Sequence, residues 1–237
     1  MTDRIEISRE LVQSGELERI VKEYEREGNF TLMDPDERDA TRHRLLADLT
    51  EDEDVWLFAY GSLIWNPTIE FLEKRAGTLH GFHRQFCLKT LMGRGTPDNP
   101  GLTLALEPGG ECCGILFRVA AAEREQELKI VWGREMLSGA YRPQWVEVET
   151  EQETVRAIAF TMNHDYPNYT GPLPEEHIVN TMATAIGPLG GCWEYLFQTC
   201  EHLADNDLDD SHLTRLRELT LAHPGFIGRD QVDRDGI

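Results

Sequence analysis

One glutamate of this sequence lies where a charged group is costly to bury. At about 100° per residue, the helix predicted over Ala121–Leu137 has an apolar stripe with Glu135 near its centre. The stripe consists of Leu128, Val131, Trp132 and Glu135. Charged residues that lie off the stripe include Glu123, Arg124, Glu127 and Arg134. A carboxylate that faces a core must be ion-paired, protonated or used in proton transfer, and burial moves its pKa toward that of a useful base. These residues alone leave open a proton-transfer role or a structural ion pair with Arg84 or Arg142.

A glycine at the end of a buried strand is the second feature with chemical content. The apolar run Val55–Tyr60 predicts a strand, and Gly61 ends it. Without a Cβ, the backbone at Gly61 can turn sharply and approach a ligand closely. The amides that follow can converge on a carboxylate, and Ser62 adds a hydroxyl. A plain strand-end turn has the same sequence, so both interpretations stay open on these residues alone.

Metal and covalent chemistry have little support in the sequence. The eight histidines are scattered without a His-Glu-x-x-His motif, and His80 and His83 fall on opposite faces of a predicted strand. The five cysteines form no Cys-x-x-Cys pair, and there is no Gly-x-Ser-x-Gly motif. We therefore expect no metal, no cofactor and no disulfide framework.

The charge of the chain excludes several kinds of partner. Its formal net charge is −20, which opposes binding to nucleic acids or anionic membranes, since phosphates require clustered Lys and Arg. The first residues, Met1–Ser14, are charged throughout, and no apolar run is long enough to span a bilayer. We expect a cytoplasmic protein that does not insert into membranes.

The predicted elements combine helices with hairpin-spaced strands. The predicted helices are Ser8–Glu27, one that starts with Asp34 as N-cap and Pro35 as first residue, Ala121–Leu137, Glu175–Ile186, Trp193–Ala204 and Leu213–Leu221. The predicted strands are Val55–Tyr60, Thr78–Lys89, Leu102–Leu106, Cys112–Val119, Trp145–Glu149 and Val155–Met162. The segment Glu107–Glu111 is predicted as a hairpin turn, Met92–Gly101 and Asn163–Pro174 as loops, and the tail from Gly228 as frayed. This pattern indicates an α+β fold with a curved, largely antiparallel sheet or a small mixed β-barrel and flanking helices.

Five segments carry a resemblance, and they follow one another in a fixed order. The segments are Phe58–Trp65, His83–Phe86, Arg134–Glu135 with Gly139–Tyr141, Asn168–Pro172, and Gly187–Gly190 with Glu194–Leu196. In this order they resemble the motifs of the ChaC-type γ-glutamylcyclotransferases. The departures from those motifs are Ala59 for Gly, Met136 for Lys, Cys192 for Asn, and two additional residues between Glu135 and Tyr141.

The resemblance implies a γ-glutamylcyclotransferase-like fold and a cofactor-independent enzyme that cleaves glutathione, a small-molecule substrate, to 5-oxoproline and Cys-Gly. It places proton transfer on Glu135. The substrate-binding positions that it implies are Leu57, Phe58, Ala59, Tyr60, Gly61, Ser62, Leu63, Arg84, Tyr141 and Tyr169. Alternatives are a cyclotransferase for other γ-glutamyl amines or amino acids, or a non-enzymatic regulator of cation transport.

The sequence also predicts how the chain is divided into regions and where the selectivity of the site would arise. Residues 1–54 form an acidic helical extension, residues 55–197 the catalytic domain, and residues 198–237 a C-terminal helix and acidic tail that pack on the core. We expect a monomer or a homodimer. Selectivity for the Cys-Gly half would come from the two long loops, with Arg94 meeting the glycine carboxylate.

Overall fold

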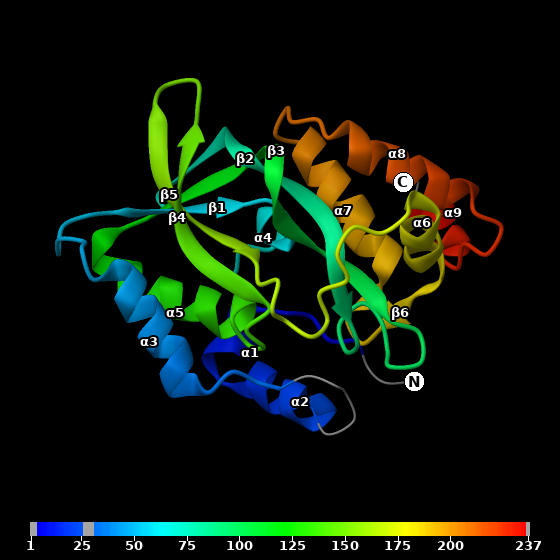
Figure 1. Ribbon diagram of the computed structural model, residues 1–237, viewed down its shortest axis with the longest axis horizontal. Helices are drawn as coiled ribbons and strands as arrows, with labels where there is room; N and C mark the ends of the chain where they lie inside the picture. Colours follow the sequence, from blue (N-terminus) through cyan, green and yellow to red (C-terminus); the bar gives the residue numbers. More distant parts are fainter. Residues whose placement is uncertain (1–3, 26–30, 236–237) are drawn as a thin grey trace. The chain divides into compact units, whose positions relative to one another are not determined.

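Five strands close into a barrel in the order β1-β3-β2-β4-β5 (Figure 1). They are β1 (Val55–Ala59), β2 (Glu73–Thr90), β3 (Gly101–Val119), β4 (Tyr141–Glu149) and β5 (Thr154–Met162). Strand β1 runs antiparallel to β3 and parallel to β5, and β4 and β5 form an antiparallel hairpin. This computed structural model describes residues 4–25 and 31–235. With its flanking helices, the mixed barrel confirms the predicted α+β class.

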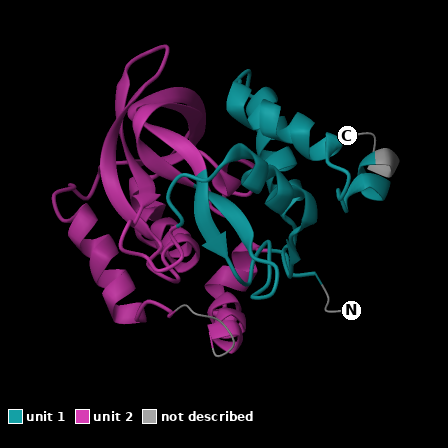
Figure 2. Ribbon diagram, turned by 45° about the vertical axis from the view of Figure 1, so that its right-hand side comes forward, with its two compact units in different colours: residues 1–6, 86–104, 170–237 teal, residues 7–85, 105–169 magenta. Residues whose placement is uncertain are grey.

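The chain is divided between two units (Figure 2). Unit 1 comprises residues 1–6, 86–104 and 170–237, and unit 2 comprises residues 7–85 and 105–169. The predicted regions 1–54, 55–197 and 198–237 concern which part of the chain carries catalysis, whereas the units are defined by packing. That division of the sequence therefore stays a prediction.

The predicted turn at Glu107–Glu111 is wrong, because β3 continues through it as a single strand. A hairpin would pair the two halves of β3 with each other. Instead, Leu106 pairs with Thr161 of β5 and Val119 pairs with Val55 of β1. Gly109 and Gly110 have φ angles of 102° and 68°, so the two glycines bend the strand without reversing it. In β3, residues that are typical of turns therefore form a bend within a continuous strand.

The helices α1 (Arg9–Gln13) and α2 (Glu16–Glu25) replace the single helix predicted over Ser8–Glu27. The break is at Gly15, which has a φ of 74°. The end of the prediction, residues 26 and 27, lies outside the described residues. The next helix, α3 (Pro35–Leu46), begins as predicted, because the Asp34 carboxylate accepts hydrogen bonds from the amides of Asp36 and Glu37.

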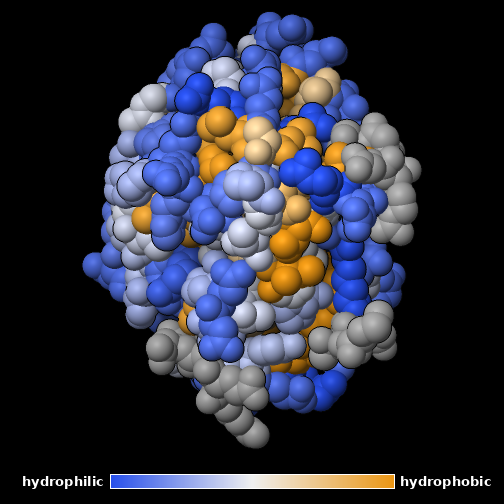
Figure 3. Space-filling model, turned by 90° about the vertical axis from the view of Figure 1, so that its right-hand side faces the viewer, coloured by the Kyte–Doolittle hydropathy of each residue, from blue (hydrophilic) through white to orange (hydrophobic). Residues whose placement is uncertain are grey.

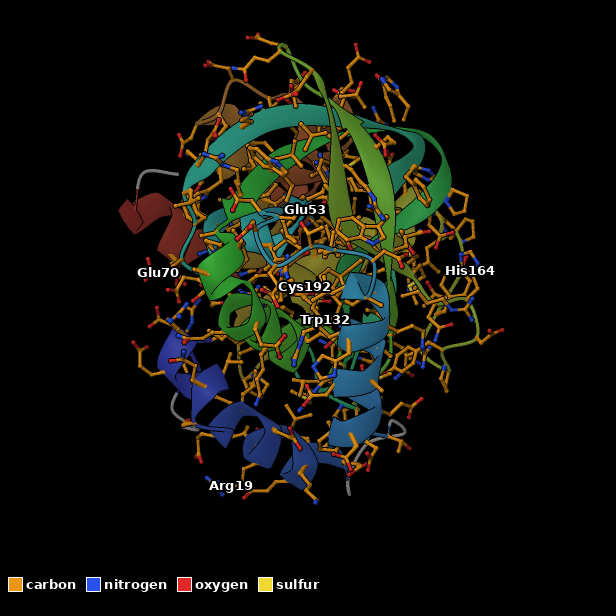
Figure 4. All side chains as sticks on the ribbon, turned by 90° about the vertical axis from the view of Figure 1, so that its left-hand side faces the viewer. Arg19, Glu53, Glu70, Trp132, His164 and Cys192 are labelled. Atoms are coloured by element: carbon orange, nitrogen blue, oxygen red, sulfur yellow. The ribbon has the colours of Figure 1, made fainter. Side chains whose placement is uncertain are left out.

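Both α1 and α3 pack against α5 (Arg124–Glu135), the helix that carries Glu135. The Arg9 guanidinium binds the Glu127 carboxylate through two nitrogens, each 2.5 Å from an oxygen. The Trp132 indole, which is fully buried on α5, donates to the Thr41 hydroxyl over 3.0 Å (Figure 4). Glu127 is thus a buried structural residue, although the periodicity placed it off the apolar stripe.

Unit 1 contains α6 (Glu175–Thr184), α7 (Cys192–Ala204) and α8 (Ser211–Ala222), which pack against one another. It also contains α9 (Arg229–Asp235), so the prediction of a frayed tail from Gly228 is wrong over the part that the structure describes. Ile186 and Ile227 remain 54% and 49% exposed. Figure 3, which faces the side of α8 and α9, shows apolar side chains reaching the surface between charged ones.

A close backbone approach in unit 1 explains one glycine of the sequence motifs. The short strands β6 (Ile186–Gly187) and β7 (Gly190–Gly191) pair with each other beside the loop 91–100. A Cβ on Gly187 would lie 2.5 Å from the carbonyl oxygens of Gly93 and Gly95. Only glycine fits there without moving the loop backbone.

Candidate active site

The first strand and β5 end at the same end of the barrel, because they run parallel. The Tyr60 hydroxyl, just beyond β1, donates to the Phe160 carbonyl near the end of β5 over 2.7 Å. The amide of Asn163, just beyond β5, donates to the Ala140 carbonyl over 2.9 Å. Ala140 follows Glu135 by only five residues in the chain. The glycine loop and the segment after α5 are therefore held at one end of the barrel in unit 2.

The glycine loop opens directly into α4 (Ser62–Trp65), with Gly61 as the N-cap. The side chains of Leu57, Phe58 and Ala59 have no exposed surface, and Tyr60 and Leu63 are 7% and 5% exposed. These buried side chains pack beneath the loop on both faces of β1. Ser62 is half-buried, and a ligand could meet its hydroxyl and the loop amides.

A single arginine connects this loop to Glu135. Arg134 donates from Nε to Glu135 Oε1 over 2.8 Å and from Nη2 to Ser62 Oγ over 2.8 Å. Its third nitrogen donates to the Asn66 carbonyl just after α4. The side chains of Arg134 and Glu135 are 5% and 14% exposed. The guanidinium therefore fixes the carboxylate relative to the serine of the loop.

The predicted structural partners of Glu135 are wrong. Arg84 donates to the Cys113 carbonyl, and Arg142 pairs with Asp165, whereas Arg134 binds Glu135. Helical periodicity placed Arg134 off the stripe, but α5 ends at Glu135, so the long side chain can turn back toward α4. In the sequence, the only indication that Arg134 belongs to the site was its place next to Glu135 in the third resembling segment.

Burial raises the pKa of the Glu135 carboxyl above its ordinary value of 4.5. The charge of Arg134 and its hydrogen bond act in the opposite direction without cancelling the effect of burial. A carboxyl with a raised pKa is a stronger base when ionised and a readily available acid when protonated. This is the property that a group which both takes and returns a proton requires.

We predict that Glu135→Gln makes the fold more stable near pH 7. Because the folded pKa is raised, the stability of the wild-type protein is highest below the unfolded pKa and falls as the pH rises through the folded pKa. Glutamine imitates the protonated form and can still accept the Arg134 hydrogen bond. Thermal unfolding should give a higher Tm for the variant at pH 7, with the difference narrowing toward pH 4. A lower Tm at pH 7 would contradict the pKa direction.

The other predicted substrate-binding residues also lie in unit 2. Arg84 is 4% exposed and bonds to Cys113, two residues before Ile115, which pairs with Ala59 at the end of β1. Tyr141 begins β4 opposite Met162, the last residue of β5. These pairings place Arg84 and Tyr141 at the barrel end that carries the glycine loop.

Tyr169 lies on the loop that follows β5 and is half-buried. Its hydroxyl donates to Glu107 Oε2 over 3.1 Å, and its ring packs against His164 with the centroids 4.8 Å apart. Glu107 was predicted to lie in a turn and His164 in a loop, and neither was assigned to the site from the sequence.

The surroundings of Arg94 differ from those predicted for a residue that meets the substrate from a flexible loop. Arg94 is 7% exposed in unit 1, lies 3.5 Å from Glu194 and donates to the Gly191 carbonyl over 3.4 Å. Arg4 also binds Glu194. Arg94 therefore belongs to a buried ion cluster within unit 1, and its predicted contact with the glycine carboxylate stays a prediction.

Two further structural findings concern metals and membranes. Within residues 4–25 and 31–235, no group of three or more His, Cys, Asp or Glu side chains is arranged to hold a metal ion. Over the same part of the chain, no helix has the length and apolar character needed to cross a bilayer. The cytoplasmic location stays a prediction.

The architecture of barrel and flanking helices is that of the γ-glutamylcyclotransferase fold. The crystal structure of the yeast γ-glutamylcyclotransferase specific to glutathione matches it with a TM-score of 0.66 at 21% identity, covering 71% of this chain and 96% of that chain. A family model described as ChaC-like protein matches residues 55–222. The chain therefore belongs to the ChaC-like family, as the resembling segments predicted.

Relatives of known activity agree with this membership. The chain is 40% identical over 186 residues to the glutathione-specific γ-glutamylcyclotransferase of Escherichia coli (strain K12), covering 78% of this chain and 80% of the relative. It is 31% identical over 175 residues to the glutathione-specific γ-glutamylcyclotransferase 1 of Danio rerio, covering 71% and 89%. These relatives are enzymes, in agreement with the predicted class.

Proposed function

We propose that the protein is a γ-glutamylcyclotransferase that converts glutathione to 5-oxoproline and Cys-Gly, with Glu135 as the proton-transfer group. The names of the Escherichia coli and Danio rerio relatives support the substrate. The observation that carries the proposal is the bridge from Glu135 through Arg134 to Ser62, which joins a carboxylate of raised pKa to the glycine loop.

The reaction poses two proton-transfer problems. The α-amine of the substrate must attack the carbonyl carbon of its own γ-amide, but near neutral pH an α-amine with a pKa of about 8 is mostly protonated. The departing amine of Cys-Gly must in turn receive a proton. One carboxylate placed between the two nitrogens takes the proton from the first and delivers it to the second. We assign both transfers to Glu135.

The other residues of the proposed site bind the substrate and orient it for ring closure. Ring closure is intramolecular, so holding the γ-glutamyl group in a folded conformation removes a large part of the entropic barrier. We assign the α-carboxylate to the amides of residues 60–63, which need no nearby cation. The same loop is our candidate for stabilising the tetrahedral oxyanion. We do not assign Tyr169 to the oxyanion, because its hydroxyl proton is directed at Glu107.

A cyclotransferase of broader range is the second candidate. The observation that favours it is the burial of Arg94 beside Glu194, because the guanidinium expected to bind the glycine carboxylate of glutathione already has a carboxylate partner. The residues gathered around Glu135 would then act on the γ-glutamyl half, which all such substrates share.

A product assay separates the two candidates. Purified protein is incubated with reduced glutathione, oxidised glutathione, γ-Glu-Cys and γ-Glu-Ala, and 5-oxoproline is quantified for each. For the glutathione-specific enzyme we predict a kcat/KM for reduced glutathione at least about tenfold above the other three, the size of one contact to the Cys-Gly half. Equal values for reduced glutathione and γ-Glu-Cys would establish the broader enzyme. No 5-oxoproline from any substrate would refute the proposed function.

A further inference from the structure

Glu107 is a buried glutamate in the middle of β3. It is 8% exposed, and both of its oxygens lie 3.1 Å from His164 Nε2. One of them also accepts the Tyr169 hydroxyl over 3.1 Å. A carboxylate with so little exposure requires such partners. Both of these partners come from one loop, residues 163–169, on which Figure 4 labels His164.

This loop is tied to the proposed site at its first residue. The Asn163 amide donates to the Ala140 carbonyl and its side chain donates to the Gly139 carbonyl, each over 2.9 Å. Within the loop, the amides of Tyr166 and Tyr169 each donate to the carbonyl three residues earlier. Leu106, the neighbour of Glu107, pairs with Thr161 near the end of β5. Glu107 therefore acts on the loop close to where it leaves the barrel.

Contacts of different kinds hold the ring and the hydroxyl of Tyr169. The ring packs on His164 with an interplanar angle of 38°, and the hydroxyl is directed at Glu107. A phenol donates only one proton, so the bond to Glu107 engages that proton and fixes where the hydroxyl end of the side chain lies. Tyr169 is the last residue of unit 2 in the chain, so this bond fixes the far end of the loop within that unit.

We infer that Glu107 is a positioning residue for substrate binding: acting through the Tyr169 hydroxyl, it holds residues 163–169 in the conformation that receives the γ-glutamyl peptide. The inference rests on the proposed function and on the assignment of Tyr169 to the binding site. Glu107 touches no reacting atom in this scheme. Its loss should therefore change KM and leave kcat, which depends on Glu135, almost unaltered.

The test is a double-mutant cycle with Glu107→Ala and Tyr169→Phe, assayed with glutathione. Each single variant should raise KM about tenfold, the size of one hydrogen bond to a charged group, with kcat within about twofold of wild type. The double variant should raise KM no more than Glu107→Ala alone, since both changes break the Tyr169–Glu107 hydrogen bond. Glu107→Gln, which keeps an acceptor for the hydroxyl, should restore KM to within about threefold. Glu111→Ala, at an exposed glutamate of the same strand, is the control and should behave as wild type.

Several results would overturn the inference. The inference fails if the KM effects of the two single variants multiply in the double variant. It also fails if KM is unchanged in Tyr169→Phe, or if the variants lower kcat alone. If Glu107→Ala does not fold, Tyr169→Phe and Glu107→Gln decide the matter. Hydrogen exchange gives a readout that needs no activity. Peptides covering residues 163–169 should exchange faster in Tyr169→Phe than in wild type, and an unchanged rate would refute the positioning role even if the wild-type protein made no 5-oxoproline.

Discussion

Glu135→Gln is expected to lower kcat for 5-oxoproline formation by at least about 10²-fold and by up to about 10⁴-fold, with KM nearly unchanged. Glutamine has the shape of the carboxyl and can accept the Arg134 hydrogen bond, but it cannot carry a proton between the two substrate nitrogens. The loss therefore isolates proton transfer from substrate binding. The measurement is a steady-state assay of 5-oxoproline at saturating glutathione.

The matched control is Glu123→Gln, at an exposed glutamate just before α5, and it should retain wild-type activity. The Tm of Glu135→Gln should confirm that the fold survives. A variant with near-normal kcat would remove Glu135 from the mechanism, even if the product assay had established the reaction itself.

Arg134→Gln is expected to lower kcat/KM at pH 7 by about 10- to 100-fold, the size of a lost charge-assisted hydrogen bond. The Arg134 charge and hydrogen bond lower the pKa of Glu135 against the effect of burial. Their removal therefore raises that pKa further, and the acid limb of the kcat/KM profile should move to higher pH. The fold should also lose about 3 kcal/mol in the free energy of unfolding, because a buried carboxyl loses its partner. The measurements are a pH–rate profile and denaturant unfolding.

Arg134→Lys separates charge from geometry. Lysine restores a positive charge, but it cannot reach Glu135, Ser62 and Asn66 together with the fixed fork of a guanidinium. The acid limb should therefore return most of the way toward its wild-type position, with kcat/KM only partly restored. An acid limb at the same pH in wild type and Arg134→Gln would mean that a group other than Glu135 controls the profile.

The sequence predicted well where local chemistry decides the structure. Asp34 caps α3 as expected, because an Asp-Pro start satisfies the free amides of a helix without help from the rest of the chain. The β4–β5 hairpin also forms, and it extends four residues beyond the predicted Trp145, since alternation marks a strand better than its ends. The glycine loop follows β1 as predicted, although its binding role stays a prediction.

Prediction from the sequence failed where contacts between distant segments determine the structure. The residues around Gly109 have turn composition, but pairing of β3 with β1 and β5 keeps the strand continuous. Arg94 belongs to a loop by composition, and only folding shows that Glu194 lies beside it. Periodicity identified Glu135 because its position within α5 is a local property. Its partner Arg134 is set by the end of the helix and by α4, which periodicity does not describe.

The interleaved units have a consequence for synthesis on the ribosome. Residues 86–104 belong to unit 1, but the rest of that unit, apart from residues 1–6, is residues 170–237. Residues 86–104 therefore cannot pack against residues 170–237 until residues 105–169 have been translated. At about 5–20 residues per second this delay lasts several seconds. During that time the apolar side chains of Phe86, Leu88 and Leu102, which are buried in the finished fold, lack the helices of unit 1. A nascent chain that stalls near residue 170 would therefore be a natural substrate for chaperones that shield apolar strands.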